Sequence, residues 1–199
     1  MRYTNPWDIH PDLSQERLVS VGQLLRLARN DALDRFDPNI GDDSWTLGCC
    51  AFQYGRHRIS EAALSGRFSW LAVQDDSKHF VFRIGAIPVR FYRGAADEPT
   101  ARTLQQSFPE LRQLSLGFPE ESVERNFAYR FAIETDTDGM ILSISFVALL
   151  GDSPVLRWDI PLDAEIRPIH SIGGILAEGV ELNAPTVRIP GADDSAEEA

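Results

Sequence analysis

The chain has 199 residues and a formal net charge of −11, and 43% of its residues are hydrophobic. That length can bury a core without disulfide bonds or a structural metal. No apolar run approaches the roughly 18 residues of a membrane helix, and none follows Arg2 as it would in a signal peptide. The two cysteines, Cys49 and Cys50, are adjacent and cannot join distant segments. We therefore expect a soluble protein of the reducing cytoplasm, without a membrane span.

The N-terminal third predicts two amphipathic helices. Apolar residues recur at gaps of three and four up to Phe36, and Asp12 or Ser14 can begin this first helix. Ser44 can cap a second helix that continues to about Leu64. Together they predict a helical part over 12–64.

Six short segments have the composition and alternation of strands. They are 69–74, 79–84, 87–92, 127–134, 140–149 and 155–160. Gly85-Ala86 has the glycine-first form of a type II′ hairpin turn, which predicts that Phe82 faces Val89. Asp138-Gly139 predicts a second hairpin. Pro88 cannot donate to a strand ladder, so its strand should lie at an edge or a bulge.

The segment 101–115 has helical spacing and lies between the third and fourth strands. The predicted fold class is therefore α+β: an antiparallel sheet of about six strands in βββ-α-βββ order, preceded by two N-terminal helices. We expect one domain over 1–180, with the sheet core at 69–160. Prolines and a terminal acidic run predict an extended and disordered tail over 181–199.

Two acidic segments have the spacing of metal sites. Asp76-Ser77-Lys78, with Asp75 beside it, has the acid-x-lysine pattern of metal-dependent nucleases. The segment 134–139 has acids at alternate positions, as an EF-hand loop does, but Ser145 stands where that loop needs a glutamate. We interpret both as polar hairpin turns. A metal-dependent nuclease or hydrolase that uses Asp75, Asp76 and Lys78 remains an alternative function.

No HExxH, CxxC, GxSxG, GxGxxG or Walker pattern occurs in the sequence. His57 lies between two arginines and could act as a general acid or base, but we interpret it as an exposed helix residue. The sequence therefore assigns no catalytic residue, no cofactor and no metal ion, and we expect no enzymatic activity.

A cluster of arginines stands out in this acidic chain. Arg83, Arg90 and Arg93 are close in sequence, and the hairpin register places Arg83 and Arg90 on the same side. Such a cluster could hold an anionic partner, either a carboxylate-rich peptide or RNA. The alternative is that these arginines pair with surface acids. The candidate partner-binding residues are Arg83, Arg90, Tyr92, Arg93, Arg56, His57 and Arg58.

The function expected from these observations is a non-catalytic, acidic protein-binding module of the chaperone, inhibitor or operon-partner kind. The element order and the acidity resemble the acidic dimeric chaperones of type III secretion, although here a further helix comes first. That resemblance implies a protein partner and a homodimer. An inhibitor that covers a basic enzyme has the same charge. RNA or DNA binding is an alternative only through the arginine patch, because the net charge repels phosphate backbones.

Overall fold

The computed structural model describes residues 3–100, 127–151 and 153–162. Its helices are α1 (Pro6–Ile9), α2 (Gln15–Asp34) and α3 (Ser44–Leu64), with a short 3-10 turn at Pro38–Ile40. Ser14 precedes α2 in extended conformation, and Asp43 caps α3 by accepting the N–H groups of Trp45 and Thr46 at 2.9 Å. Both long helices were predicted, whereas α1 was not. None of the helices in these residues combines the length and apolarity that crossing a membrane requires.

All six predicted strands are present and form one sheet in the order of the sequence. They are β1 (Leu71–Asp75), β2 (Val81–Ile84), β3 (Ile87–Arg93), β4 (Ala128–Thr135), β5 (Ile141–Leu150) and β6 (Ser153–Asp159). The turn at Gly85-Ala86 has the predicted register, with Phe82 opposite Val89 and a φ of +59° at Gly85 alone. The α+β class is therefore confirmed.

The prediction of an antiparallel sheet was wrong at one pair of strands. β3 and β4 run parallel, from Val89 opposite Tyr129 to Arg93 opposite Ile133, while the other four pairs are antiparallel. A parallel pair needs a crossover rather than a hairpin, and the long connection after Arg93 provides it. The helix predicted at 101–115 and the tail predicted at 181–199 lie outside the described residues.

The prediction that the strand of Pro88 lies at an edge or a bulge was also wrong, because β3 is the third of six strands and its pairings with β2 and β4 have no register shift. Pro88 faces Arg83 of β2, and the ladder with β4 begins one residue later, at Val89. Pro88 therefore lies just outside the ladder between β3 and β4, which its missing N–H would otherwise weaken.

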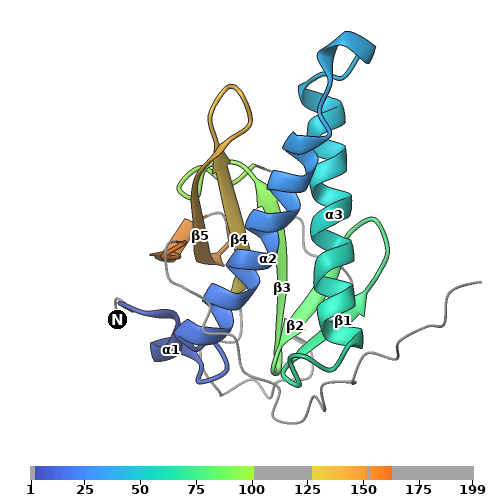
Figure 1. The fold of residues 1–199 in the computed structure, drawn as a ribbon. Coiled ribbons are helices and arrows are strands. Elements are labelled where there is room, and N and C mark those ends of the chain that lie inside the picture. The colour runs from blue at the N-terminus through green and yellow to red at the C-terminus, as the bar shows by residue number, and fades with distance from the viewer. Residues whose placement is uncertain (1–2, 101–126, 152, 163–199) are drawn as a thin grey trace, which may run out of the picture. The chain divides into compact units, whose positions relative to one another are not determined.

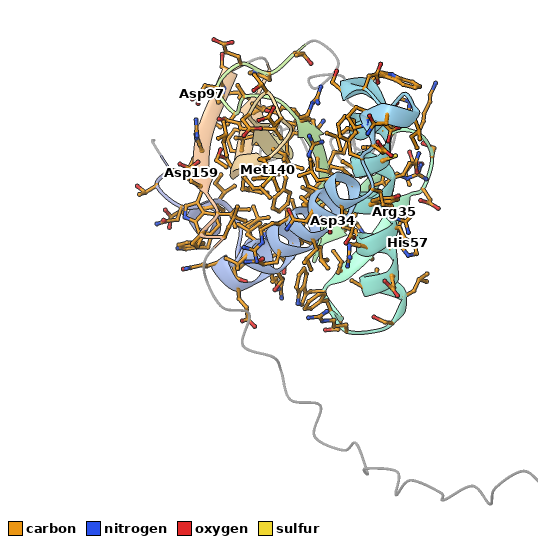
Figure 2. All side chains as sticks on the ribbon, turned by 45° about the horizontal axis from the view of Figure 1, so that its top comes forward. Asp34, Arg35, His57, Asp97, Met140 and Asp159 are labelled. Atoms are coloured by element: carbon orange, nitrogen blue, oxygen red, sulfur yellow. The ribbon has the colours of Figure 1, made fainter. Side chains whose placement is uncertain are left out.

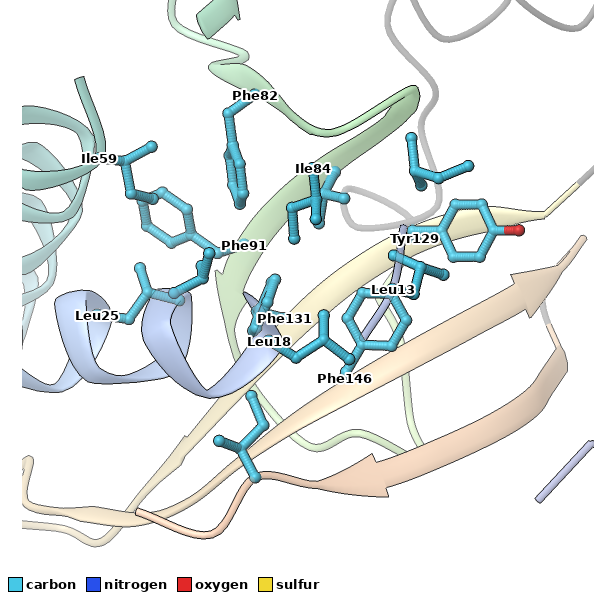
Figure 3. Close-up of a cluster of buried hydrophobic side chains, with 14 of the residues drawn as sticks. Leu13, Leu18, Leu25, Ile59, Phe82, Ile84, Phe91, Tyr129, Phe131 and Phe146 are labelled. Atoms are coloured by element: carbon cyan, nitrogen blue, oxygen red, sulfur yellow. The ribbon is translucent and has the colours of Figure 1, made fainter. Parts of the chain in front are cut away.

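The helices α2 and α3 lie side by side across one face of the sheet (Figure 1). The main core fills the space between these layers, and Figure 3 shows Leu18, Leu25 and Ile59 of the helices meeting Phe91 and Phe131 of the sheet. Gly55 allows this approach, since a Cβ there would lie 2.9 Å from Cζ of Phe91.

The opposite face of the sheet has smaller and more polar side chains. Ala128, Ala132, Val147 and Leu149 form a second apolar cluster with Ala96. Next to it, Arg157 makes ion pairs with Asp97 at 2.6 Å and with Asp159 at 2.9 Å. Figure 2 labels these two acids on the same side of the molecule.

Candidate anion-binding pocket

The predicted arginine cluster lies partly in a cavity of about 400 Å³ between the C-terminal half of β3 and the N-terminal half of α3. From the cluster, Arg90, Tyr92 and Arg93 line this cavity, together with Phe91. The helix contributes Ser44, Trp45, Gly48, Cys49, Phe52 and Gln53. Lys78, Thr100 and Arg130 complete the lining among the described residues.

The local structure explains why these residues meet. On α3, Trp45, Gly48, Cys49 and Phe52 follow the three- and four-residue spacing that places side chains on one face of a helix. On β3, the pairing with β2 ends at Val89, so the described strands pair Arg90 to Arg93 only with β4. The pocket lies beside this segment of β3.

The charge of the pocket is opposite to that of the protein. Four cationic side chains line it, Lys78, Arg90, Arg93 and Arg130, and no carboxylate is among the described lining residues. We call this cavity the basic pocket. The protein as a whole carries a net charge of −11. A concentrated positive charge in an otherwise negative molecule favours an anionic ligand at this position.

Two of the four cations remain available to a ligand. The side chains of Arg93 and Lys78 are exposed, and neither forms a hydrogen bond or an ion pair with another described residue. The N-terminus of α3 is not the source of the charge, because the carboxylate of Asp43 already accepts two of its free N–H groups. The arginine and lysine side chains therefore provide the donors.

The aromatic residues of the pocket add a surface for contact. Trp45 is 74% exposed, an uncommon position for the largest apolar side chain. The hydroxyl of Tyr92 donates to the main-chain oxygen of Ala95 at 3.0 Å, and burial raises the pKa of Tyr92 to about 12. Tyr92 is therefore a neutral side chain at physiological pH and adds no negative charge to the pocket.

The other predicted arginines do not join the basic pocket. Arg56 binds Asp76 at 3.0 Å, and Arg58 forms a close ion pair with Asp31. Arg83 is exposed at the β2–β3 hairpin. The alternative interpretation, pairing with surface acids, therefore holds for Arg56 and Arg58.

His57 lies on the other side of α3. It lines a separate cavity of about 480 Å³ with Asp34, Arg35 and Glu61, and Figure 2 labels Asp34, Arg35 and His57 close together. The structure therefore places His57 away from the basic pocket.

The acidic turn 75–78 has a structural role in the described residues. Asp75 accepts the N–H of Ser77 at 2.8 Å, which is the main reason that its pKa is lowered. Asp76 is bound by Arg56. No group of three or more His, Cys, Asp or Glu side chains in the described parts of the chain is arranged to hold a metal ion. Lys78 of this turn lines the basic pocket instead.

Behind the basic pocket is a second cavity of about 50 Å³, which we call the inner cavity. It shares five lining residues with the basic pocket: Gly48, Phe52, Phe91, Tyr92 and Arg93. Arg29 of α2 lines only the inner cavity and is 4% exposed. Its Nε donates to the main-chain oxygen of Gly139 at 2.7 Å.

Sequence reasoning missed Arg29 and Arg130. A signal for Arg29 existed, because it follows Leu25 by four residues and so lies on the apolar face of α2. Arg130 stands between Ala128 and Ala132 on its face of β4, and small neighbours leave room to bury a long side chain.

The site therefore consists of an outer pocket with four cations and an inner cavity that contains one buried arginine. Its chemistry is that of anion recognition, with guanidinium groups that bind carboxylates through two parallel hydrogen bonds. No protein-family model, no curated protein and no solved structure matches this chain.

Proposed function

We propose that this protein is a non-catalytic binding module that recognises an acidic segment of a partner protein in the basic pocket. The observation that carries the proposal is the lining of the pocket, which has four cationic side chains and no carboxylate among the described residues. Lys78 and Arg93 are exposed, and within the described ranges neither side chain has to give up a hydrogen bond or an ion pair to meet a ligand.

The residue types favour recognition of a protein segment. Arginine and exposed tryptophan are enriched among residues that dominate protein–protein affinity, and both are present here, as Arg93 and Trp45. A cavity of about 400 Å³ has room for a few side chains rather than a domain. A short acidic stretch that places one or two carboxylates against the cations matches this size.

The overall charge favours an acidic peptide over a nucleic acid. A long phosphate backbone extends beyond the pocket and meets the negative remainder of the surface, which repels it. A short peptide contacts the pocket alone. The experiment below therefore includes an oligonucleotide, so that binding of RNA or DNA would be detected.

The test is fluorescence anisotropy with a labelled oligo-glutamate peptide, a glycine-serine peptide of equal length and a single-stranded oligonucleotide. We expect the wild-type protein to bind oligo-glutamate, and the variant Arg93→Glu to lose about tenfold or more in affinity. Arg83→Glu is the matched control, because it makes the same change of charge at an exposed arginine outside the pocket.

Three outcomes overturn the proposal. The first is that the wild-type protein does not bind oligo-glutamate at low salt. The second is an equal loss of affinity in Arg83→Glu and Arg93→Glu, which would reflect net charge alone. The third is tighter binding of the oligonucleotide than of the peptide.

A further inference from the structure

The inner cavity presents an unusual charge distribution. Arg29 is almost fully buried, and its Nη2 has no hydrogen-bond partner among the described residues. Arg93 lines the same cavity, so two arginines border about 50 Å³ of space. The rest of the lining is mostly apolar, with Leu25, Phe52 and Phe91 among its members.

This arrangement is costly without an anion. A buried donor that lacks a partner loses its hydration without compensation. Burial lowers the pKa of Arg29, and the positive charge of Arg93 lowers it further. Asp136 acts in the opposite direction, but its Oδ1 already accepts the N–H groups of Asp138 and Met140 in the β4–β5 turn. A negative group inside the cavity would lie between the two cations and offset the repulsion between them.

We infer that the inner cavity binds one carboxylate group between Arg29 and Arg93, as the anchor of the acidic ligand that enters the basic pocket. This inference rests on the proposed function, from which it takes the acidic ligand. It adds the chemical group of that ligand that the inner cavity binds. The carboxylate comes from an Asp or Glu side chain or from the C-terminus of the partner.

The volume favours a carboxylate. A buried water needs about 10–15 Å³, so a cavity of about 50 Å³ accepts roughly three to five atoms of that size. A carboxylate has three heavy atoms and is planar, which matches the fork of a guanidinium. Inorganic phosphate is tetrahedral and has five heavy atoms, so it would fill this space to its upper limit.

Gly48 lies where the two cavities meet, because it lines both. A Cβ at this position would lie 4.0 Å from Nη1 of Arg93. The missing side chain therefore leaves space beside the arginine that the ligand must pass. The apolar walls formed by Phe52 and Phe91 make the surroundings less polar, which strengthens the interaction between a carboxylate and Arg29.

The first experiment uses acetate as the probe and reads the arginine Nε–Hε signals in a ¹⁵N spectrum of the whole protein. We expect acetate to shift the signal that disappears in Arg29→Met, and to shift it more than chloride or phosphate at equal ionic strength. An Arg29 signal that acetate leaves unmoved overturns the inference. A larger shift with phosphate than with acetate also overturns it.

The second experiment measures oligo-glutamate affinity in variants of the inner cavity. Arg29→Met should weaken binding by about tenfold, the value of a charge-assisted hydrogen bond, while the outer cations retain part of the affinity. Gly48→Leu should weaken peptide binding by a similar factor, because its side chain narrows the space between the two cavities while Arg29 stays intact. This second variant tests the inference even if Arg29→Met does not fold. Unchanged affinity in Gly48→Leu and in folded Arg29→Met overturns the inference.

The two proposals fail in different ways. If oligo-glutamate binds through Arg93 but acetate does not shift Arg29, the proposed function stands and the inner anchor is wrong. If acetate shifts Arg29 but the peptide does not bind, the anchor stands and the proposed function is wrong. Two further peptides, an amidated oligo-glutamate and a neutral peptide with a free C-terminus, distinguish the two sources of the carboxylate. The peptide that loses affinity in Arg29→Met relative to the wild-type protein carries the carboxylate that Arg29 binds.

Discussion

Arg29 and Gly139 are 110 residues apart in sequence, and the Nε of the arginine donates to the main-chain oxygen of the glycine at 2.7 Å. The hydrogen bond joins the C-terminal half of α2 to the tip of the β4–β5 hairpin. It also fixes the position of the guanidinium that lines the inner cavity. The geometry of the hairpin tip and the proposed anchor site are therefore linked.

The first prediction concerns the tip itself. Gly139 has a φ of +87°, and a Cβ there would lie 2.5 Å from Nη2 of Arg29 and 2.7 Å from Cδ2 of Leu47. Gly139→Ala should lower the free energy of unfolding by about 3 kcal/mol, the sum of backbone strain and overpacking. Urea denaturation measures the change.

Gly41→Ala is the control for this prediction. Gly41 has a φ of +101°, and nothing lies within 4 Å of a Cβ placed on it. Its substitution should cost only the backbone term, about 1 kcal/mol. Equal losses at the two positions would contradict the close contact between Gly139 and Arg29.

The second prediction compares two glycines of α3. Alanine is favoured over glycine within a helix by up to about 1 kcal/mol, so Gly48→Ala should stabilise the protein, since its Cβ meets only Arg93 at 4.0 Å. At Gly55 the Cβ would lie 2.9 Å from the ring of Phe91. We therefore expect Gly55→Ala to be destabilising by about 1 kcal/mol despite the helix preference. Thermal unfolding of both variants tests the sign of each effect.

The elements that the sequence predicted are those with local causes. The apolar spacing of α2 and α3 and the turn at Gly85-Ala86 each depend on a few neighbouring residues. The parallel pairing of β3 with β4 depends instead on where a long crossover brings the chain, and no local pattern specifies it. That is why the strands were predicted and the sheet type was not.

The site was predicted only in part for the same reason. Arg90 and Arg93 were found because they are close in sequence on one strand. Arg56 and Arg58 were added by their proximity in sequence, but neighbouring positions on a helix point in different directions, and each meets its own acid. Arg29 reaches the site only through the packing of α2 against the sheet.

The third prediction is a pH dependence at Asp12. Its carboxylate accepts the N–H of Ala86 at 2.9 Å and binds Arg17 at 2.6 Å, and these contacts lower its pKa below 3.8. A carboxylate whose pKa is lower in the folded state stabilises the fold at pH values above its pKa in the unfolded state. This contribution is lost as the pH falls through its pKa in the folded state. Asp12→Asn should therefore be less stable than the wild type at pH 7, by about 1 kcal/mol.

The difference between Asp12→Asn and the wild type should shrink as the pH is lowered through 3.8 and then through the lowered pKa of the folded state. Urea denaturation of both proteins across this range measures it. Asp138→Asn, an exposed change on the β4–β5 turn, is the control and should follow the wild type at every pH. A constant difference for Asp12→Asn would show that its charge is not the cause.

The fourth prediction uses two serines of β5. Ser145 is fully buried and donates to Oδ1 of Asp159 at 2.6 Å, which is the largest cause of the lowered pKa of that carboxyl. Ser143 has a buried hydroxyl, for which the described part of the chain provides no hydrogen-bond partner. Ser145→Ala should therefore raise the pKa of Asp159 toward 3.8 and destabilise the fold at pH 7, whereas Ser143→Ala should leave that pKa unchanged and be neutral or stabilising.

The measurement for the serine pair is a carboxyl ¹³C titration combined with denaturation at neutral pH. Because the pKa of Asp159 is lowered, its contribution to stability is present above 3.8 and disappears at lower pH. The cost of Ser145→Ala should therefore decline in acid, while Arg157 keeps part of the shift through its hydrogen bond of 2.9 Å to Asp159. A larger loss of stability in Ser143→Ala than in Ser145→Ala would mean that the buried serine next to Asp159 does not hold this face of the sheet together.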